Sequence, residues 1–134
     1  MNTRDVLKCL TKKCKNCGIT INRLDKSIEM DEDGGYVAGY DSDNNEITLC
    51  VKGKTKTWEV VFLTHEFSHY LWEKNYVYNT SKPLKYKEYN NNTFFIELQV
   101  ESLTLKILQK LKANKKIIDY CKKAIINNLK DYLK

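Results

Sequence analysis

Between residues 60 and 72 the chain reads Val60-Val61-Phe62-Leu63-Thr64-His65-Glu66-Phe67-Ser68-His69-Tyr70-Leu71-Trp72, which is a His-Glu-x-x-His motif inside an apolar run. Both histidines of the chain lie in this motif. On an α-helix, residues four positions apart lie one turn apart on the same face. Two imidazoles placed in this way can bind one Zn²⁺ ion, each at about 2.0–2.1 Å. The motif therefore predicts a zinc-binding helix.

The residues around the motif favour a buried helix. Apolar side chains recur at helical spacing and predict its core face: Val60, Leu63, Phe67 and Leu71. The alternative is a pair of hydrogen-bonded histidines with no metal. Burying two imidazoles and a carboxylate costs free energy unless something pairs with them, and a metal ion would do so. In zinc sites of this kind the glutamate, here Glu66, is the general base of peptide hydrolysis.

Length and composition describe an ordinary globular domain. The chain has 134 residues, of which 42% are hydrophobic and 30% charged, and its formal net charge is +6. We expect a single domain over residues 1–134. No stretch is long and apolar enough to cross a membrane, and the start of the chain does not resemble a secretory signal. We therefore expect a cytoplasmic protein with no membrane partner; nothing in the sequence fixes an oligomeric state.

The five cysteines do not suggest a disulfide framework, because their number is odd and the expected compartment is reducing. Cys14 and Cys17 form half of a zinc-ribbon pattern, and Cys9 could supply a third ligand. A fourth ligand is missing nearby. We therefore interpret these three as ordinary cysteines near a helix end.

Three short segments alternate in hydropathy and predict strands at residues 19–24, 36–40 and 46–51. Turn-forming residues occupy 31–35 and 41–45. Closely spaced strands joined by short turns favour a small antiparallel sheet that ends in a hairpin.

Helices are expected at residues 2–16, from about 55 to 74, from about 92 to 108 and at about 115–133. Gly18 ends the first helix, and Thr55 or Thr57 is the N-cap of the second. The fold class that follows is α+β. A small antiparallel three-stranded sheet would pack on an N-terminal helix, the His-Glu-x-x-His helix and a glutamate-bearing helix.

A catalytic zinc ion needs a third protein ligand and one open position. Because no third histidine exists, this ligand must be a carboxylate or a cysteine. Glu97 lies 28 residues after His69 on the next expected helix, and Glu101 follows it by one turn on the same face. One carboxylate would bind the metal, while the other would accept a hydrogen bond from a ligand histidine and fix its tautomer.

Together, His65-Glu66-Phe67-Ser68-His69 and the later Glu97-Leu98-Gln99-Val100-Glu101 resemble the gluzincins. Over about residues 36–108 the chain looks most like the ImmA/IrrE-like minimal gluzincins, which are small cytoplasmic peptidases often found in phages and mobile elements. The resemblance implies a zincin-like domain with one catalytic Zn²⁺ ion held by His65, His69 and Glu97. Glu101 would support a histidine, although it stands where the family usually has Asp. Because of this departure, the opposite assignment of Glu97 and Glu101 stays open.

The function implied is zinc-dependent hydrolysis of a protein or peptide, in related proteins often one specific regulatory protein. Glu66 would take a proton from water and pass it to the leaving amine. A tyrosine could stabilise the oxyanion, and the candidates are Tyr76, Tyr78, Tyr86, Tyr89 and Tyr120. The strand at 46–51 could align an extended substrate along an exposed edge.

Two other functions are compatible with the sequence. The first is a zinc-binding, non-catalytic regulator of zincin-like fold. The second is a small basic nucleic-acid-binding protein in which the motif is accidental. In that case the lysines near the C-terminus could contact phosphates. Such a pattern is more often a solvated helix surface. The lysines are Lys110, Lys112, Lys115, Lys116, Lys122, Lys123, Lys130 and Lys134.

Overall fold

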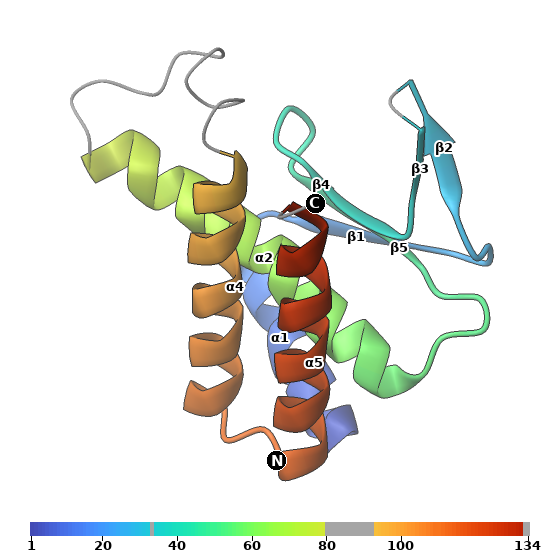
Figure 1. Cartoon of the computed structure of the whole chain (residues 1–134), viewed down its shortest axis with the longest axis vertical. Helices are drawn as coiled ribbons and strands as arrows, with labels where there is room; N and C mark the ends of the chain where they lie inside the picture. Colours follow the sequence, from blue (N-terminus) through green and yellow to red (C-terminus); the bar gives the residue numbers. More distant parts are fainter. Residues whose placement is uncertain (33, 80–92, 133–134) are drawn as a thin grey trace.

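A computed structural model describes residues 1–32, 34–79 and 93–132, and in this part of the chain the protein has an α+β fold (Figure 1). The elements, in chain order, are α1 (Thr3–Asn16), β1 (Thr20–Leu24), β2 (Glu29–Asp31), β3 (Gly34–Tyr36), β4 (Ala38–Asp41), β5 (Glu46–Cys50), α2 (Lys56–Asn79), α4 (Thr93–Lys110) and α5 (Lys115–Tyr132). The expected α+β class and the four expected helices are confirmed.

Helix α1 is amphipathic and covers one side of α2. Its N-cap is Asn2, whose side-chain oxygen accepts a hydrogen bond from the backbone N–H of Asp5 at 2.9 Å. The helix buries Val6, Leu10 and Cys14. The chain leaves the helix at Gly18, whose φ of 73° lies in the left-handed region that favours glycine.

The main sheet is mixed, with strand order β1-β5-β4. Strands β4 and β5 form the expected antiparallel hairpin, in which Gly39 lies opposite Thr48. Strand β1 pairs with β5 in parallel, with Ile21 opposite Ile47, so the prediction of a purely antiparallel sheet is wrong. The segment between β1 and β5 is long enough for the crossover that a parallel pair requires, and it also contains the separate two-stranded sheet β2-β3.

The topology also corrects the prediction about the exposed edge. The strand predicted at residues 46–51 is β5, which is hydrogen-bonded on both sides and is therefore the central strand. The edges of the sheet are β1 and β4. A peptide that added a strand to this sheet would have to pair with one of these two strands.

Helix α2 is the central element of the fold, and it contacts α1, α4, α5, β4 and β5. Its first turn is capped by Thr55, whose hydroxyl accepts a hydrogen bond from the backbone N–H of Trp58 at 3.1 Å. The core face is largely as expected: Val60, Leu63 and Phe67 are buried and Leu71 is half-buried. The expected end near residue 74 is too early, because no glycine or proline interrupts the helix before Asn79.

Helices α4 and α5 pack against the same side of α2. The core side chains of α4 include Val100 and Leu108, and those of α5 include Ile117 and Cys121. The side-chain amide oxygen of Asn114 caps the start of α5, because it accepts a hydrogen bond from the backbone N–H of Ile117 at 3.0 Å. Among the helices of the described residues, none has the length and apolar character needed to cross a membrane.

Candidate metal centre

Two helices bring the predicted site residues together. Helix α2 carries His65, Glu66 and His69, and α4 carries Glu97 and Glu101. The two helices pass the site in opposite directions, so the earlier histidine meets the later glutamate and the later histidine meets the earlier glutamate. Each of these side chains belongs to a described part of its helix.

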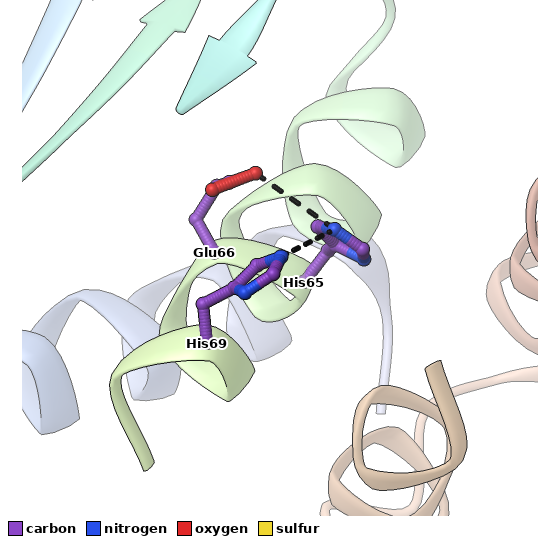
Figure 2. Close-up of side chains that lie close together, drawn as sticks. All are labelled: His65, Glu66 and His69. Atoms are coloured by element: carbon purple, nitrogen blue, oxygen red, sulfur yellow. Dashed lines mark hydrogen bonds and ion pairs between the residues drawn. The ribbon is translucent and has the colours of Figure 1, made fainter. Parts of the chain in front are cut away.

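The imidazoles of His65 and His69 converge (Figure 2). Their Nε2 atoms are 3.2 Å apart. The Glu97 carboxylate reaches both rings, with Oε1 3.2 Å from Nε2 of His69 and Oε2 3.6 Å from Nε2 of His65. Three donor groups of the types that zinc prefers therefore surround one point.

These separations match the edges of a tetrahedral zinc site. Two nitrogen ligands at about 2.0–2.1 Å from a tetrahedral zinc ion lie about 3.3–3.4 Å apart. The Nε2–Nε2 distance and the shorter Glu97 distance are both 3.2 Å, and the longer Glu97 distance is 3.6 Å. The donor set therefore fits a Zn²⁺ ion with little rearrangement.

Glu101 supports the site from behind. Its carboxylate accepts a hydrogen bond from Nδ1 of His65, and its side chain is buried. This bond holds the proton on Nδ1 and leaves the Nε2 lone pair facing His69 and Glu97. A hydrogen bond to the far nitrogen is how proteins usually orient a histidine that binds a metal.

Glu66 is placed beside the donors and not among them. Its Oε1 atom is 3.9 Å from Nε2 of His65, and its side chain is buried. Single ligand atoms of His65, Glu66 and His69 all lie within 4.8 Å of one another, which is close enough for a carboxylate to reach a water molecule on a shared ion (Figure 2).

Burial and neighbouring charges have opposite effects on the pKa values of ionisable groups in this centre. Burial lowers the pKa of His65, but the hydrogen bond with Glu101 and the nearby carboxylates outweigh it and raise this pKa to about 9. Burial raises the pKa of Glu66. Burial would also raise the pKa of Glu97, but its contacts with His69 and His65 lower it. The carboxylates thus favour a positive charge at His65, which a metal ion can supply in place of a proton.

Two polar contacts around the centre were not anticipated from the sequence. Asn128 of α5 donates a hydrogen bond from Nδ2 to Oε2 of Glu97 at 3.0 Å. Thr104 of α4 donates to the hydroxyl of Ser68 on α2 at 3.1 Å. The first contact orients the carboxylate, and the second fixes α4 against α2 beside the histidines. A single asparagine in an asparagine-rich chain gives no signal that could have identified Asn128.

The centre opens into a cleft of about 890 Å³. One wall is the edge strand β4, through Ala38, Gly39 and Tyr40, and the opposite wall is α5. Trp58 and Phe62 of α2 also line the cleft, with their rings stacked at a centroid distance of 4.6 Å. The cleft combines an exposed backbone edge with apolar side chains, as peptide-binding sites often do.

The predicted tyrosines separate into two groups. Tyr120 of α5 lines the cleft, and burial raises its pKa, so its hydroxyl stays protonated at neutral pH. Tyr86 and Tyr89 lie outside the described residues, and so do the side chains of Tyr76 and Tyr78. Tyr40 and Tyr132, which the sequence did not single out, also line the cleft.

The cysteines of α1 lie apart from this centre. Cys14 is fully buried in the core, and burial raises the pKa of its thiol to about 12. A thiol that resists ionisation is a poor metal ligand. Three or more His, Cys, Asp or Glu side chains that lie close together could hold one metal ion. The only such group in the described ranges contains His65, Glu66 and His69.

Comparison with protein-family models, with curated proteins and with solved structures gives no match to this chain.

Proposed function

We propose that this protein is a zinc-dependent metallopeptidase of the gluzincin type with a zincin-like fold. The observation that carries the proposal is the convergence of three donors: the Nε2 atoms of His65 and His69, 3.2 Å apart, and the Glu97 carboxylate within 3.2 Å and 3.6 Å of them. Glu97 is the third ligand in this proposal, because Glu101 is already engaged by Nδ1 of His65.

A bound zinc ion would polarise the scissile carbonyl and lower the pKa of an attacking water molecule. Glu66 then acts as the general base, because its carboxylate lies beside the ligand histidines. It accepts the proton from water and transfers it to the amine that leaves. Burial of Glu66, which raises its pKa, makes it a stronger base than an exposed carboxylate.

Two further features of the cleft suit a peptide substrate. The edge strand β4 can pair with an extended segment and hold it across the centre. Tyr120 supplies a protonated hydroxyl from the opposite wall, and among the five tyrosines considered it is the one whose side chain the structure describes in the cleft. We assign Tyr120 as the donor to the developing oxyanion.

The proposal is tested by combining metal analysis with cleavage. The full chain is stripped of metal, reconstituted with Zn²⁺ and desalted, and one zinc ion per chain is expected. The zinc-loaded protein is then incubated with a library of peptides derived from a cell lysate, and new termini are identified by mass spectrometry. Glu66→Gln should keep the zinc and lose about 10²–10⁴-fold in cleavage rate.

The outcomes separate the candidate functions. Zinc binding with no cleavage, in the parent protein as well as in Glu66→Gln, would favour a non-catalytic zinc-binding regulator. Failure to retain zinc after reconstitution would exclude both functions.

Tyr120→Phe should reduce kcat by at least about tenfold with little change in KM if Tyr120 contacts the transition state.

A further inference from the structure

A second concave surface lies on the side of the protein formed by α1. This shallow groove has a volume of about 460 Å³ and shares no lining residue with the metal cleft. Its lining comes from three elements: α1, β1 and the start of α2. The residues are Arg4, Leu7, Lys8, Thr11, Lys12, Lys15, Arg23, Lys56 and Glu59.

Positive charge dominates the groove. Six basic residues and one glutamate line it, so its formal charge is +5, whereas the whole chain carries +6. The one carboxylate, Glu59, is 3% exposed and is already paired with Arg23 and Lys56. The four basic side chains that α1 contributes to the groove are exposed. The excess charge of the protein is therefore concentrated on this surface.

The cations of α1 are arranged in a line. Arg4, Lys8 and Lys12 follow one another at intervals of four residues, and Lys15 continues the row. On an α-helix this places charges about 6 Å apart over roughly 16 Å. The opposite face of the same helix, which contains Val6 and Leu10, is buried, so the row of cations faces solvent. A rigid row of this length could face roughly five phosphates of one DNA strand.

The chemistry of the groove distinguishes between possible anionic partners. A protein partner normally provides and requires an apolar or aromatic anchor at the centre of the interface. A membrane surface requires apolar side chains that enter the lipid. In the part of the chain that the structure describes, Leu7 is the only apolar residue in the groove lining, and no aromatic side chain lines it. A phosphodiester backbone needs only regularly spaced cations.

We propose that this basic groove, made by Arg4, Lys8, Lys12 and Lys15 with Arg23 and Lys56 beside them, binds the phosphate backbone of double-stranded nucleic acid. Without stacking side chains or groups that reach base edges, this contact is independent of base sequence. It is also independent of the metal centre, so the proposal does not require the peptidase function.

The test uses the full chain and a fluorescein-labelled 20-base-pair DNA duplex, with binding followed by fluorescence anisotropy. Four exposed cations predict a slope of about −3.6 for log K against log salt concentration, which is roughly a 100-fold loss of affinity between 50 and 200 mM salt. The double variant Lys8→Glu with Lys12→Glu should weaken binding at least tenfold and flatten the slope. Circular dichroism verifies that the exposed substitutions leave the helices intact.

A matched control separates the groove from general charge attraction. Lys122→Glu with Lys130→Glu changes the net charge by the same amount on exposed positions of α5, outside the groove. This control should bind the duplex within about threefold of the parent protein. Equal losses in both double variants would overturn the proposal, and so would the absence of binding at 50 mM salt. A poly-glutamate peptide of equal charge that bound the groove more tightly than the duplex would assign the surface to an acidic protein instead.

Discussion

Buried glutamates occur in two regions of this protein, and they are neutralised in different ways. Glu59, in the first turn of α2, is 3% exposed and is paired with Arg23 and with Lys56, the latter at 3.1 Å. The buried Glu66 and Glu101 and the half-buried Glu97 lie in the cleft beside the two histidines. Within the described residues, none of these three forms an ion pair with a lysine or an arginine.

The difference lies in whether the chain itself supplies the cations that accompany its carboxylates. A buried carboxylate is costly unless a cation or hydrogen-bond donors accompany it. At Glu59 the chain supplies both cations itself, so this pair is structural. In the cleft the chain supplies three carboxylates and two imidazoles, and these carboxylates raise the pKa of His65 against the effect of burial. A divalent cation, as proposed above, would balance these carboxylates.

The same contrast extends to the two concave surfaces. Five acidic residues and one lysine line the metal cleft, whereas six basic residues and one glutamate line the groove along α1. Helix α2 contributes to both surfaces, through Lys56 and Glu59 to the groove and through its histidine motif to the cleft. The protein therefore has one surface suited to a cation and another suited to anions.

The largest expected effect comes from removing a metal donor. His69→Ala should lower zinc affinity by more than about 100-fold, which exceeds the usual cost of losing a supporting residue. In the parent protein, zinc at 100 times its Kd should raise the free energy of unfolding by about 2.7 kcal/mol, measured by chemical denaturation. Glu73→Gln is the matched control, because Glu73 lines the cleft without pairing with either histidine. Equal zinc affinity in both variants would contradict the proposed centre.

The roles of the two α4 glutamates can be separated next. Glu97→Ala removes a proposed ligand, and we expect it to weaken zinc binding more than Glu101→Ala does. Loss of a supporting carboxylate such as Glu101 should cost about 10–100-fold in zinc affinity. Competition with a chromogenic chelator measures both constants. A larger loss in Glu101→Ala would reverse the assignment, and negligible losses in both would show that neither residue serves the metal.

A smaller effect is expected at Glu59, and it should depend on pH. Burial opposes ionisation, but the hydrogen bonds and charges of Arg23 and Lys56 outweigh it and lower the pKa of Glu59. Its ionised form therefore stabilises the fold above its unfolded pKa of 4.5, and this stabilisation is lost as the pH falls through the lower folded pKa. At pH 7, Glu59→Gln should cost about 1–2 kcal/mol, because its partners are partly exposed.

Denaturation of both proteins between pH 3 and 7 measures this dependence. The stability difference between the parent protein and Glu59→Gln should narrow below about pH 4.5. Glu32→Gln is the control, since it removes the same charge from an exposed position. A difference that stayed constant across this range would show that the charge of Glu59 does not matter.

The smallest effect is expected at the cysteines. Cys17→Ser should leave the number of zinc ions per chain and the zinc affinity unchanged, because the proposed zinc ligands include no cysteine. Atomic absorption and chelator competition measure the two quantities. A fall in zinc content would indicate that Cys14 and Cys17 bind zinc. The cleft would then not be the protein's one metal-binding region.

Local patterns were enough to predict the helices, the three strands of the main sheet and the antiparallel β4–β5 hairpin. They missed the two-stranded sheet β2-β3, which includes residues of the turn expected at 31–35. The alternation of residues 20–24 shows which segment is a strand, but it does not determine the direction of the neighbouring strand. The parallel pairing of β1 with β5 depends on the path of the intervening chain, so it was missed. The position of β4 at the edge of the cleft follows from the same pairing and could not be predicted.

By itself, the sequence determined the candidate chemistry of this protein, because the four-residue spacing of His65 and His69 fixes both rings on one face of a helix. The spacing of Glu97 and Glu101 likewise required a shared face on a later helix. Only the tertiary structure decided how these faces meet: the opposite directions of α2 and α4 bring Glu101 to His65 and Glu97 to His69. Asn128 and the groove along α1 were also decided there, since both join residues from elements far apart in the sequence.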